Sequence, residues 1–79
     1  MPKKLPAMSS TKFVRLLQQA GVVFVRQRGT SHAIFERVKG VQKYRAPVVM
    51  DKEELAPKYI KMVLRQLGFT EDEIPGLFP

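Results

Sequence analysis

The single histidine of this 79-residue chain stands in a stretch whose residue types suit proton transfer on a phosphate ester. His32 follows a Gly-Thr-Ser turn at residues 29–31 and opens a run with strand character, and Arg26 and Arg28 lie just before the turn. Imidazole is the side chain that ordinarily exchanges a proton near neutral pH. It can take a proton from a 2′-hydroxyl or give one to a leaving oxygen. His32 is therefore the candidate general base or acid.

Cleavage of RNA requires few catalytic groups from a small protein, because the 2′-hydroxyl of RNA is itself the nucleophile. The protein then has to place a base, hold the phosphate and stabilise the extra negative charge. Arg26, Arg28 and Arg37 are close enough to the histidine in sequence to bind the phosphate. Lys43 and Tyr44, on the next expected strand, are further candidates for contact with RNA.

The residues before the histidine are expected to position it. Gly29, Thr30 and Ser31 form the predicted turn. Ser31 is poorly placed as a nucleophile, because neighbouring residues of a strand point to opposite faces. The alternative is that His32 is an ordinary strand residue with one hydrogen bond, and spacing alone leaves both interpretations open.

Metal and cofactor chemistry is disfavoured by the residue types. With one histidine and no cysteine, carboxylates would have to be the ligands. The acidic residues at 53–54 and 71–73 more simply cap helices or face solvent. Gly29 lacks the further glycines and the lysine of a phosphate-binding loop. We expect no metal and no cofactor.

The charge of the chain predicts a polyanionic partner. Fourteen Lys and Arg against seven Asp and Glu give a net charge of +7, and no acidic residue precedes Glu36. A basic domain of this kind is typical of nucleic-acid binding. No apolar run reaches the roughly 18 residues of a membrane span, and the lack of cysteine fits a reducing compartment. We expect a cytoplasmic protein that binds RNA and no membrane.

The first half of the chain predicts a loose arm, a helix and three strands. Residues 1–8 carry the arm. Ser9 or Ser10 can cap a helix, which Gly21 ends. Strands are predicted at 22–28, 32–38 and 41–50, with turns at 29–31 and 39–40. Pro47 has no N–H to donate, so the third strand is expected at a sheet edge or at a bulge.

The second half predicts one helix and a short tail. Pro57 suits a first helical turn, an apolar stripe follows, and Gly68 ends the helix. Thr70 and Glu73 fit a capping box within the tail at 69–79. Residues 1–79 thus form one α+β domain of order α-β-β-β-α, with two helices on one face of a three-stranded antiparallel sheet.

The sequence also resembles a known family. Residues 21–29, Gly-Val-Val-Phe-Val-Arg-Gln-Arg-Gly, followed by Ser31-His32, look like the signature of HicA-type toxins, also called the YcfA-like family. The similarity extends to the helices at 9–17 and 60–68. Thr30 is one difference, since many members read Gly-Ser-His without a residue between glycine and serine.

The resemblance implies a double-stranded-RNA-binding-domain-like fold and the toxin of a type II toxin–antitoxin pair, an endoribonuclease acting on mRNA. It maps the active histidine onto His32 and implies a HicB-type antitoxin that covers it. Two alternatives stay open. One is a non-catalytic RNA-binding module of the same fold, and the other is a protein whose basic face chiefly binds an acidic partner.

Overall fold

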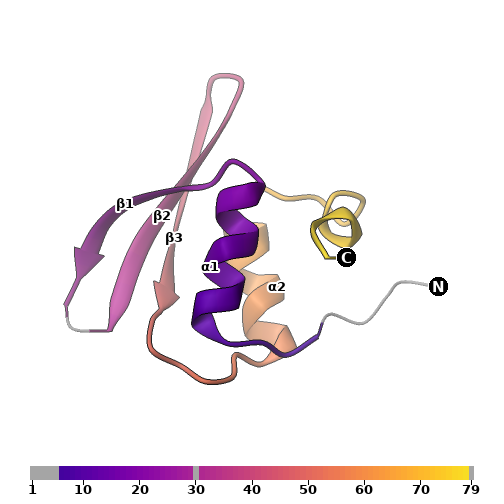
Figure 1. Cartoon of the computed structure of the whole chain (residues 1–79). Helices are drawn as coiled ribbons and strands as arrows, with labels where there is room; N and C mark the ends of the chain where they lie inside the picture. Colours follow the sequence, from indigo (N-terminus) through magenta and orange to yellow (C-terminus); the bar gives the residue numbers. More distant parts are fainter. Residues whose placement is uncertain (1–5, 30, 79) are drawn as a thin grey trace.

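The computed structural model describes residues 6–29 and 31–78 and contains two helices, one antiparallel sheet and a final 3-10 turn (Figure 1). The elements are α1 (Ser10–Gln19), β1 (Val23–Arg28), β2 (His32–Lys39), β3 (Gln42–Val49), α2 (Pro57–Gln66) and η1 (Ile74–Leu77). This order confirms the predicted α-β-β-β-α arrangement. Over these residues, neither helix has the length and apolar character needed to cross a membrane.

The sheet is a simple antiparallel meander of order β1-β2-β3. Lys39 pairs with Gln42, so the second hairpin has a two-residue loop, and Gly40 takes φ 60° there. Such tight hairpin loops need a positive φ, which glycine adopts without steric cost. β3 is an edge strand, as Pro47 predicted. β1 forms the other edge and carries a bulge between Phe24 and Arg26.

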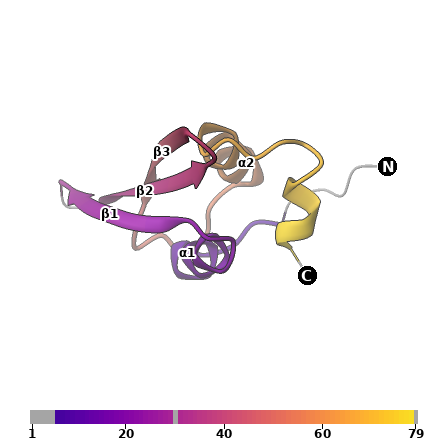
Figure 2. The ribbon, with the colours of Figure 1, turned by 90° about the horizontal axis from the view of Figure 1, so that it is seen from above.

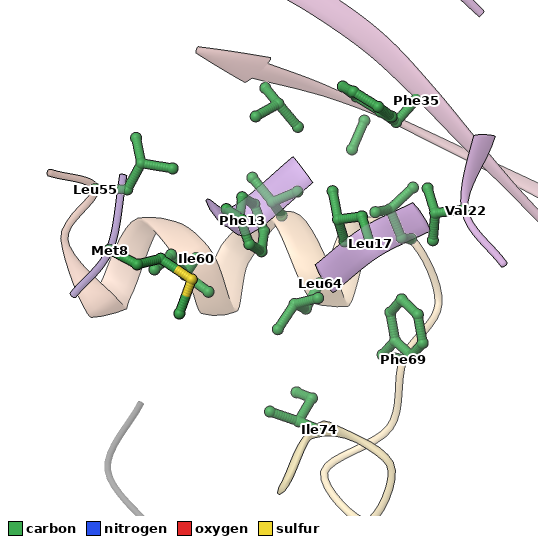
Figure 3. Packing of buried hydrophobic residues seen from close by; sticks show 14 of the residues in the cluster. Met8, Phe13, Leu17, Val22, Phe35, Leu55, Ile60, Leu64, Phe69 and Ile74 are labelled. Carbon is green, nitrogen blue, oxygen red and sulfur yellow. The ribbon is translucent and has the colours of Figure 1, made fainter. Parts of the chain in front are cut away.

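Both helices cover the same face of the sheet (Figures 1 and 2). The strand residues buried beneath them are Ala33 and Phe35 from β2, with Ala46 and Val48 from β3. They form one buried cluster with helix residues such as Phe13 and Leu17, and Figure 3 shows Phe35 on the side of the sheet that faces these helix residues. Side chains alternate across a strand, so His32, Ile34 and Glu36 of β2 and Arg45 and Pro47 of β3 point to the opposite face. No element of the described chain covers that open face (Figure 2).

The N-terminal arm is less loose than predicted. Met8 is only 6% exposed, and it forms a bridge with Leu55 through hydrogen bonds in both directions, of 3.4 and 2.6 Å. Its side chain fills the end of the core beside Leu55 (Figure 3), so burial of apolar surface fixes this residue. The prediction of a loose arm is therefore wrong at Met8, and residues 1–5 lie outside the described part of the chain.

The C-terminal tail packs onto the core as well. Phe69 and Ile74 are buried below α2 (Figure 3). The predicted capping box is confirmed, because Thr70 N–H donates to Glu73 Oε1 at 2.9 Å and Glu73 N–H donates to Thr70 Oγ1 at 3.3 Å. Pro75 does not end the turn as expected. It occupies the first turn of η1, where the missing N–H is tolerated.

Candidate functional site

His32 is exposed at the start of β2 and faces the open side of the sheet. Its chain neighbour Ala33 is fully buried against the helices, and alternation puts the imidazole on the opposite side. Arg28 of β1 and Val49 of β3 lie directly across from it. The ring is therefore accessible to a large ligand that approaches the uncovered face.

Two arginines lie on the same side of the sheet as the histidine. Arg28 pairs with His32, and Arg26 pairs with Ile34, two residues further along β2. Directly opposed residues of antiparallel strands have their Cβ atoms about 4.5–5.5 Å apart. Both arginine side chains are exposed. The structure thus brings together three of the predicted site residues, and one phosphodiester can reach an imidazole and a guanidinium at once.

A shallow hollow marks this corner of the sheet. Its lining comes from Arg28, Gly29, His32 and Pro47. Sequence reasoning used Pro47 only as a sign of an edge strand and missed it as a neighbour of the histidine. The hollow has a cationic side at Arg28 of β1 and an apolar side at Pro47 of β3.

Ser31 holds the histidine in place from the turn. Its carbonyl oxygen accepts a hydrogen bond of 2.7 Å from Met50 N–H, which ties the turn to the end of β3. Its Oγ lies 3.5 Å from His32 Nδ1, so the hydroxyl contacts this ring nitrogen, and among the described residues no hydrogen bond involves Nε2. Gly29 takes φ 68° on the other side of the turn. Thr30, which we also assigned to this turn, lies outside the described residues.

Arg37 is not part of this cluster. Its guanidinium lies on the helix side of the sheet, donates to Leu67 O at 3.2 Å and to Glu73 Oε2 at 2.9 Å, and stacks 3.9 Å from the ring centre of Phe69. Only 12% of the side chain is exposed. These contacts fasten the C-terminal tail, and the structure does not bring Arg37 to His32.

Lys43 shares the open face but not the site. It lies opposite Val38, six residues along β2 from His32, which corresponds to about 20 Å at the rise of a strand. Between the two stands Arg45, paired to Glu36 at 2.8 Å and 59% exposed. Sequence reasoning missed Arg45. The pairing register set by the 39–42 hairpin is the signal that could have found it.

The part of the chain that the structure describes holds no group of three acidic or histidine side chains arranged to bind a metal ion. The two carboxyls with lowered pKa values, those of Glu71 and Glu73, lie in the C-terminal tail. Arg65 donates a hydrogen bond to the carboxylate of Glu71. This bond, followed by the interaction with Lys61, holds the pKa of Glu71 below its usual value.

Comparison with known families gives one match. The family model described as the HicA toxin of bacterial toxin–antitoxin systems matches residues 10–69, from the start of α1 to the residue after Gly68. That range contains both helices, the whole sheet and His32. No curated protein matches, and no solved structure matches. Since the matched range spans most of the 79 residues, this chain belongs to the HicA family of toxins from bacterial toxin–antitoxin systems.

Proposed function

We propose that this HicA-family toxin is a metal-independent endoribonuclease that cleaves mRNA in the cytoplasm, with His32 as its catalytic residue. The observation that supports the proposal most directly is the pairing of His32 with Arg28 on the uncovered face of the sheet. An exposed proton-transfer group beside a fixed cation is the minimum that cleavage of an RNA phosphodiester requires.

In the proposed reaction His32 acts first as a general base. It removes the proton of the 2′-hydroxyl, the O2′–P bond forms and the P–O5′ bond breaks. The 5′-oxygen leaves with a proton from solvent or from the imidazolium, so the products are a 2′,3′-cyclic phosphate and a 5′-hydroxyl. General acid–base catalysis of this kind contributes about 10²–10⁴-fold in rate.

The arginines hold the phosphate in this scheme. Arg28 lies closest to the imidazole across the β1–β2 ladder, so it stabilises the extra charge of the transition state. Arg26 contacts the next phosphate along the open face. Ser31 positions the ring through its contact with Nδ1. Lys43 is too remote for the reacting phosphate and would contact only a longer RNA.

Membership in a toxin–antitoxin family implies an antitoxin partner and an RNA substrate. We propose that the antitoxin is of the HicB type and that it inhibits by covering His32. The cationic open face provides a suitable surface, because an acidic protein could occupy it in place of RNA.

The test compares the purified wild type with the single variants His32→Ala and Arg28→Ala on a labelled single-stranded RNA, with EDTA present. Arg15→Ala is the matched control, since Arg15 is exposed on α1 in the helix layer. We expect His32→Ala to lose at least 10²-fold in cleavage rate, Arg28→Ala to lose about tenfold or more, and the control to cleave like the wild type.

Product analysis and binding decide the remaining points. Fragments of the wild-type reaction should carry a cyclic phosphate, and His32→Ala should still bind RNA. Equal cleavage by wild type and His32→Ala would remove the histidine from the mechanism. RNA binding without cleavage by the folded, antitoxin-free wild type would favour the non-catalytic module instead.

A further inference from the structure

β1 is an edge strand with an unusual concentration of exposed apolar side chains. Val23, Phe24 and Val25 are 55%, 52% and 36% exposed, and they are consecutive. Every residue of β1 is exposed, and the strand extends away from both helices (Figures 1 and 2). Soluble proteins usually shorten, charge or cover such an edge, because its unpaired backbone groups can bind another strand.

The opposite edge of the sheet is closed at the C-terminal end of β3. The hydroxyl of Tyr59 accepts from Val49 N–H at 2.9 Å and donates to Pro47 O at 3.4 Å. Ser10 Oγ donates to Val49 O at 2.7 Å, and Pro47 has no N–H to offer. The outer backbone groups at this end of β3 are therefore used within the chain. β1 has no such contacts among the described residues, so we take it as the edge that is better prepared to accept another strand along its whole length.

Charge selects what can pair there. Arg26 and Arg28 are in β1, and no acidic residue occurs in the chain before Glu36. A second copy with the same strand and a net charge of +7 would be repelled. An acidic strand would be attracted. RNA could bind the arginines, but it offers no backbone ladder and no apolar side chains for residues 23–25.

We propose that β1 accepts an extended, acidic segment of a partner protein as a fourth strand of the sheet. Backbone hydrogen bonds give such a complex its affinity and alternate side chains give it specificity. On the open face, which Val23 shares with Arg26 and Arg28 because of the bulge between Phe24 and Arg26, an apolar side chain of the segment covers Val23 and carboxylates pair with the two arginines. Since Arg28 lines the hollow beside His32, the added strand ends next to that hollow. The inference does not depend on RNA cleavage.

The probe is a synthetic eight-residue peptide with glutamate at the two positions that face Arg26 and Arg28 and valine at the positions that face residues 23–25, used with two relatives. One has lysine in place of glutamate. The other keeps valine and glutamate but carries N-methyl groups on alternate amides, which blocks one hydrogen-bonding edge. Binding is followed by fluorescence anisotropy, and the site by amide hydrogen exchange of the full chain. We expect saturable binding of the acidic peptide, protection concentrated in β1, and at least tenfold weaker binding of both relatives.

Matched variants locate the site. The double variant Val23→Thr/Val25→Thr keeps β-branched residues and the ring of Phe24, so it should fold like the wild type. Its control is Val38→Thr/Val41→Thr, because these valines are also exposed, at 57% and 95%. We expect about fivefold or greater loss of peptide affinity in the first variant and none in the control, with equal thermal stabilities. His32→Ala should bind the peptide as the wild type does, which separates this result from that of the cleavage assay.

Several results would overturn the proposal. Equal binding of the N-methylated peptide would reduce the interaction to charge alone. Equal losses in both valine variants would place the peptide elsewhere. Self-association that disappears in Val23→Thr/Val25→Thr would assign the edge to a second copy. A 12-nucleotide RNA that protects β1, and binds this variant more weakly than the control, would make the edge an RNA surface.

Discussion

Two side chains of β2, those of His32 and Arg37, lie on opposite faces of the sheet because of their spacing in the sequence. His32 and Arg37 are five residues apart, and on a regular strand an odd separation points two side chains to opposite faces. His32 therefore meets solvent on the open face. Arg37 meets Leu67, Phe69 and Glu73 beneath the helices. One guanidinium joins the second helix to the tail, and none of its contacts reaches the site.

This arrangement predicts that Arg37→Ala lowers stability and leaves the proposed chemistry intact. The side chain is 12% exposed and makes two hydrogen bonds and a cation–π contact. We expect the free energy of unfolding to fall by about 1.5–3 kcal/mol, the range for losing hydrogen bonds that involve a charged group. Urea denaturation measures the loss. RNA affinity of the folded variant should stay within about twofold of the wild-type value.

Arg45→Ala is the control for this change. Arg45 also forms an ion pair with a glutamate, yet its side chain is 59% exposed, and exposed pairs contribute only about 0–1 kcal/mol. A loss of RNA binding by well-folded Arg37→Ala, with no change in stability, would contradict the structural role.

The sequence predicts which residues could form the site, but not which face of the sheet each side chain points to. The histidine, the flanking arginines and the turn are visible as residue types and spacing. The same parity rule that argued against Ser31 as a nucleophile would have removed Arg37, given a strand that continues without a bulge. Pro47 could not be found that way, because it reaches the hollow through the β2–β3 register, which depends on the length of a hairpin loop.

At the scale of elements, adjacent serines at the start of α1 have different functions. Ser9 caps the helix by accepting from Lys12 N–H at 3.2 Å. Ser10 is 1% exposed and joins the helix to the sheet, since its hydroxyl donates to Val49 O and accepts from Lys52 N–H at 3.1 Å. The sequence indicated that one of them was a cap. It carried no sign that the other would close the β3 edge.

Ser10→Ala should therefore destabilise the fold more than a surface change on the same helix. Two part-buried backbone groups, Val49 O and Lys52 N–H, lose their partner, and a fully buried unsatisfied group costs about 1–3 kcal/mol, which is the upper bound here. Denaturant unfolding measures the loss, with Thr11→Ala as the control because Thr11 is exposed. Faster hydrogen exchange at Lys52 would locate the effect, whereas equal stabilities of the two variants would contradict it.

The end of α2 depends on a glycine for two reasons. Gly68 has φ 81°, a conformation that L-residues with a Cβ rarely adopt, and a Cβ there would lie 2.6 Å from the ring of Tyr44. Gly68→Ala should cost about 1–3 kcal/mol through backbone strain and overpacking. Gly76→Ala is the matched control, since nothing lies within 4 Å of its added Cβ. Similar melting temperatures for the two variants would contradict the close contact with Tyr44.

The order and type of the main elements were predictable because each has a clear local signal. Helical spacing of apolar residues marked both helices, and glycine or proline marked their ends. The packing of the two ends of the chain was not predictable. Met8, Phe69 and Ile74 lie outside the periodic apolar patterns that mark the helices and strands, and only the assembled core shows that each is buried.

At the scale of the whole molecule, the acidic tail lies against basic elements and should make stability depend on pH. Glu73 has a lowered pKa, chiefly because Thr70 N–H donates to it, with Arg37 and Lys39 adding to the effect. The pKa of Glu71 is lowered by Arg65 and Lys61. A carboxyl with a lowered folded-state pKa adds stability above its unfolded value, and that stability is lost as pH falls through the folded-state value.

The variant Glu71→Gln/Glu73→Gln tests this dependence. Its melting temperature should lie below that of the wild type at neutral pH, where both carboxylates are ionised and paired. The difference should begin to shrink as pH falls below the ordinary carboxyl value of 4.5, and it should disappear once the pH is below the lowered folded-state pKa values of both carboxyls. A difference that stays constant over this range would show that the substitutions act through packing and not through charge.

The uneven charge of the molecule leads to a last prediction, the salt dependence of RNA binding. When a protein neutralises Z phosphates of a single-stranded nucleic acid, bound cations are released. A plot of log K for binding against log salt concentration then has a slope of about −0.7Z. If Arg26 and Arg28 each contact a phosphate, replacing either with alanine should make the slope shallower by about 0.7. Measurements in the His32→Ala background avoid cleavage during titration. Arg15→Ala removes the same charge from the helix layer and should leave the slope nearly unchanged. A uniform decrease in all three variants would mean that RNA binds diffusely around the basic domain and not along the open face.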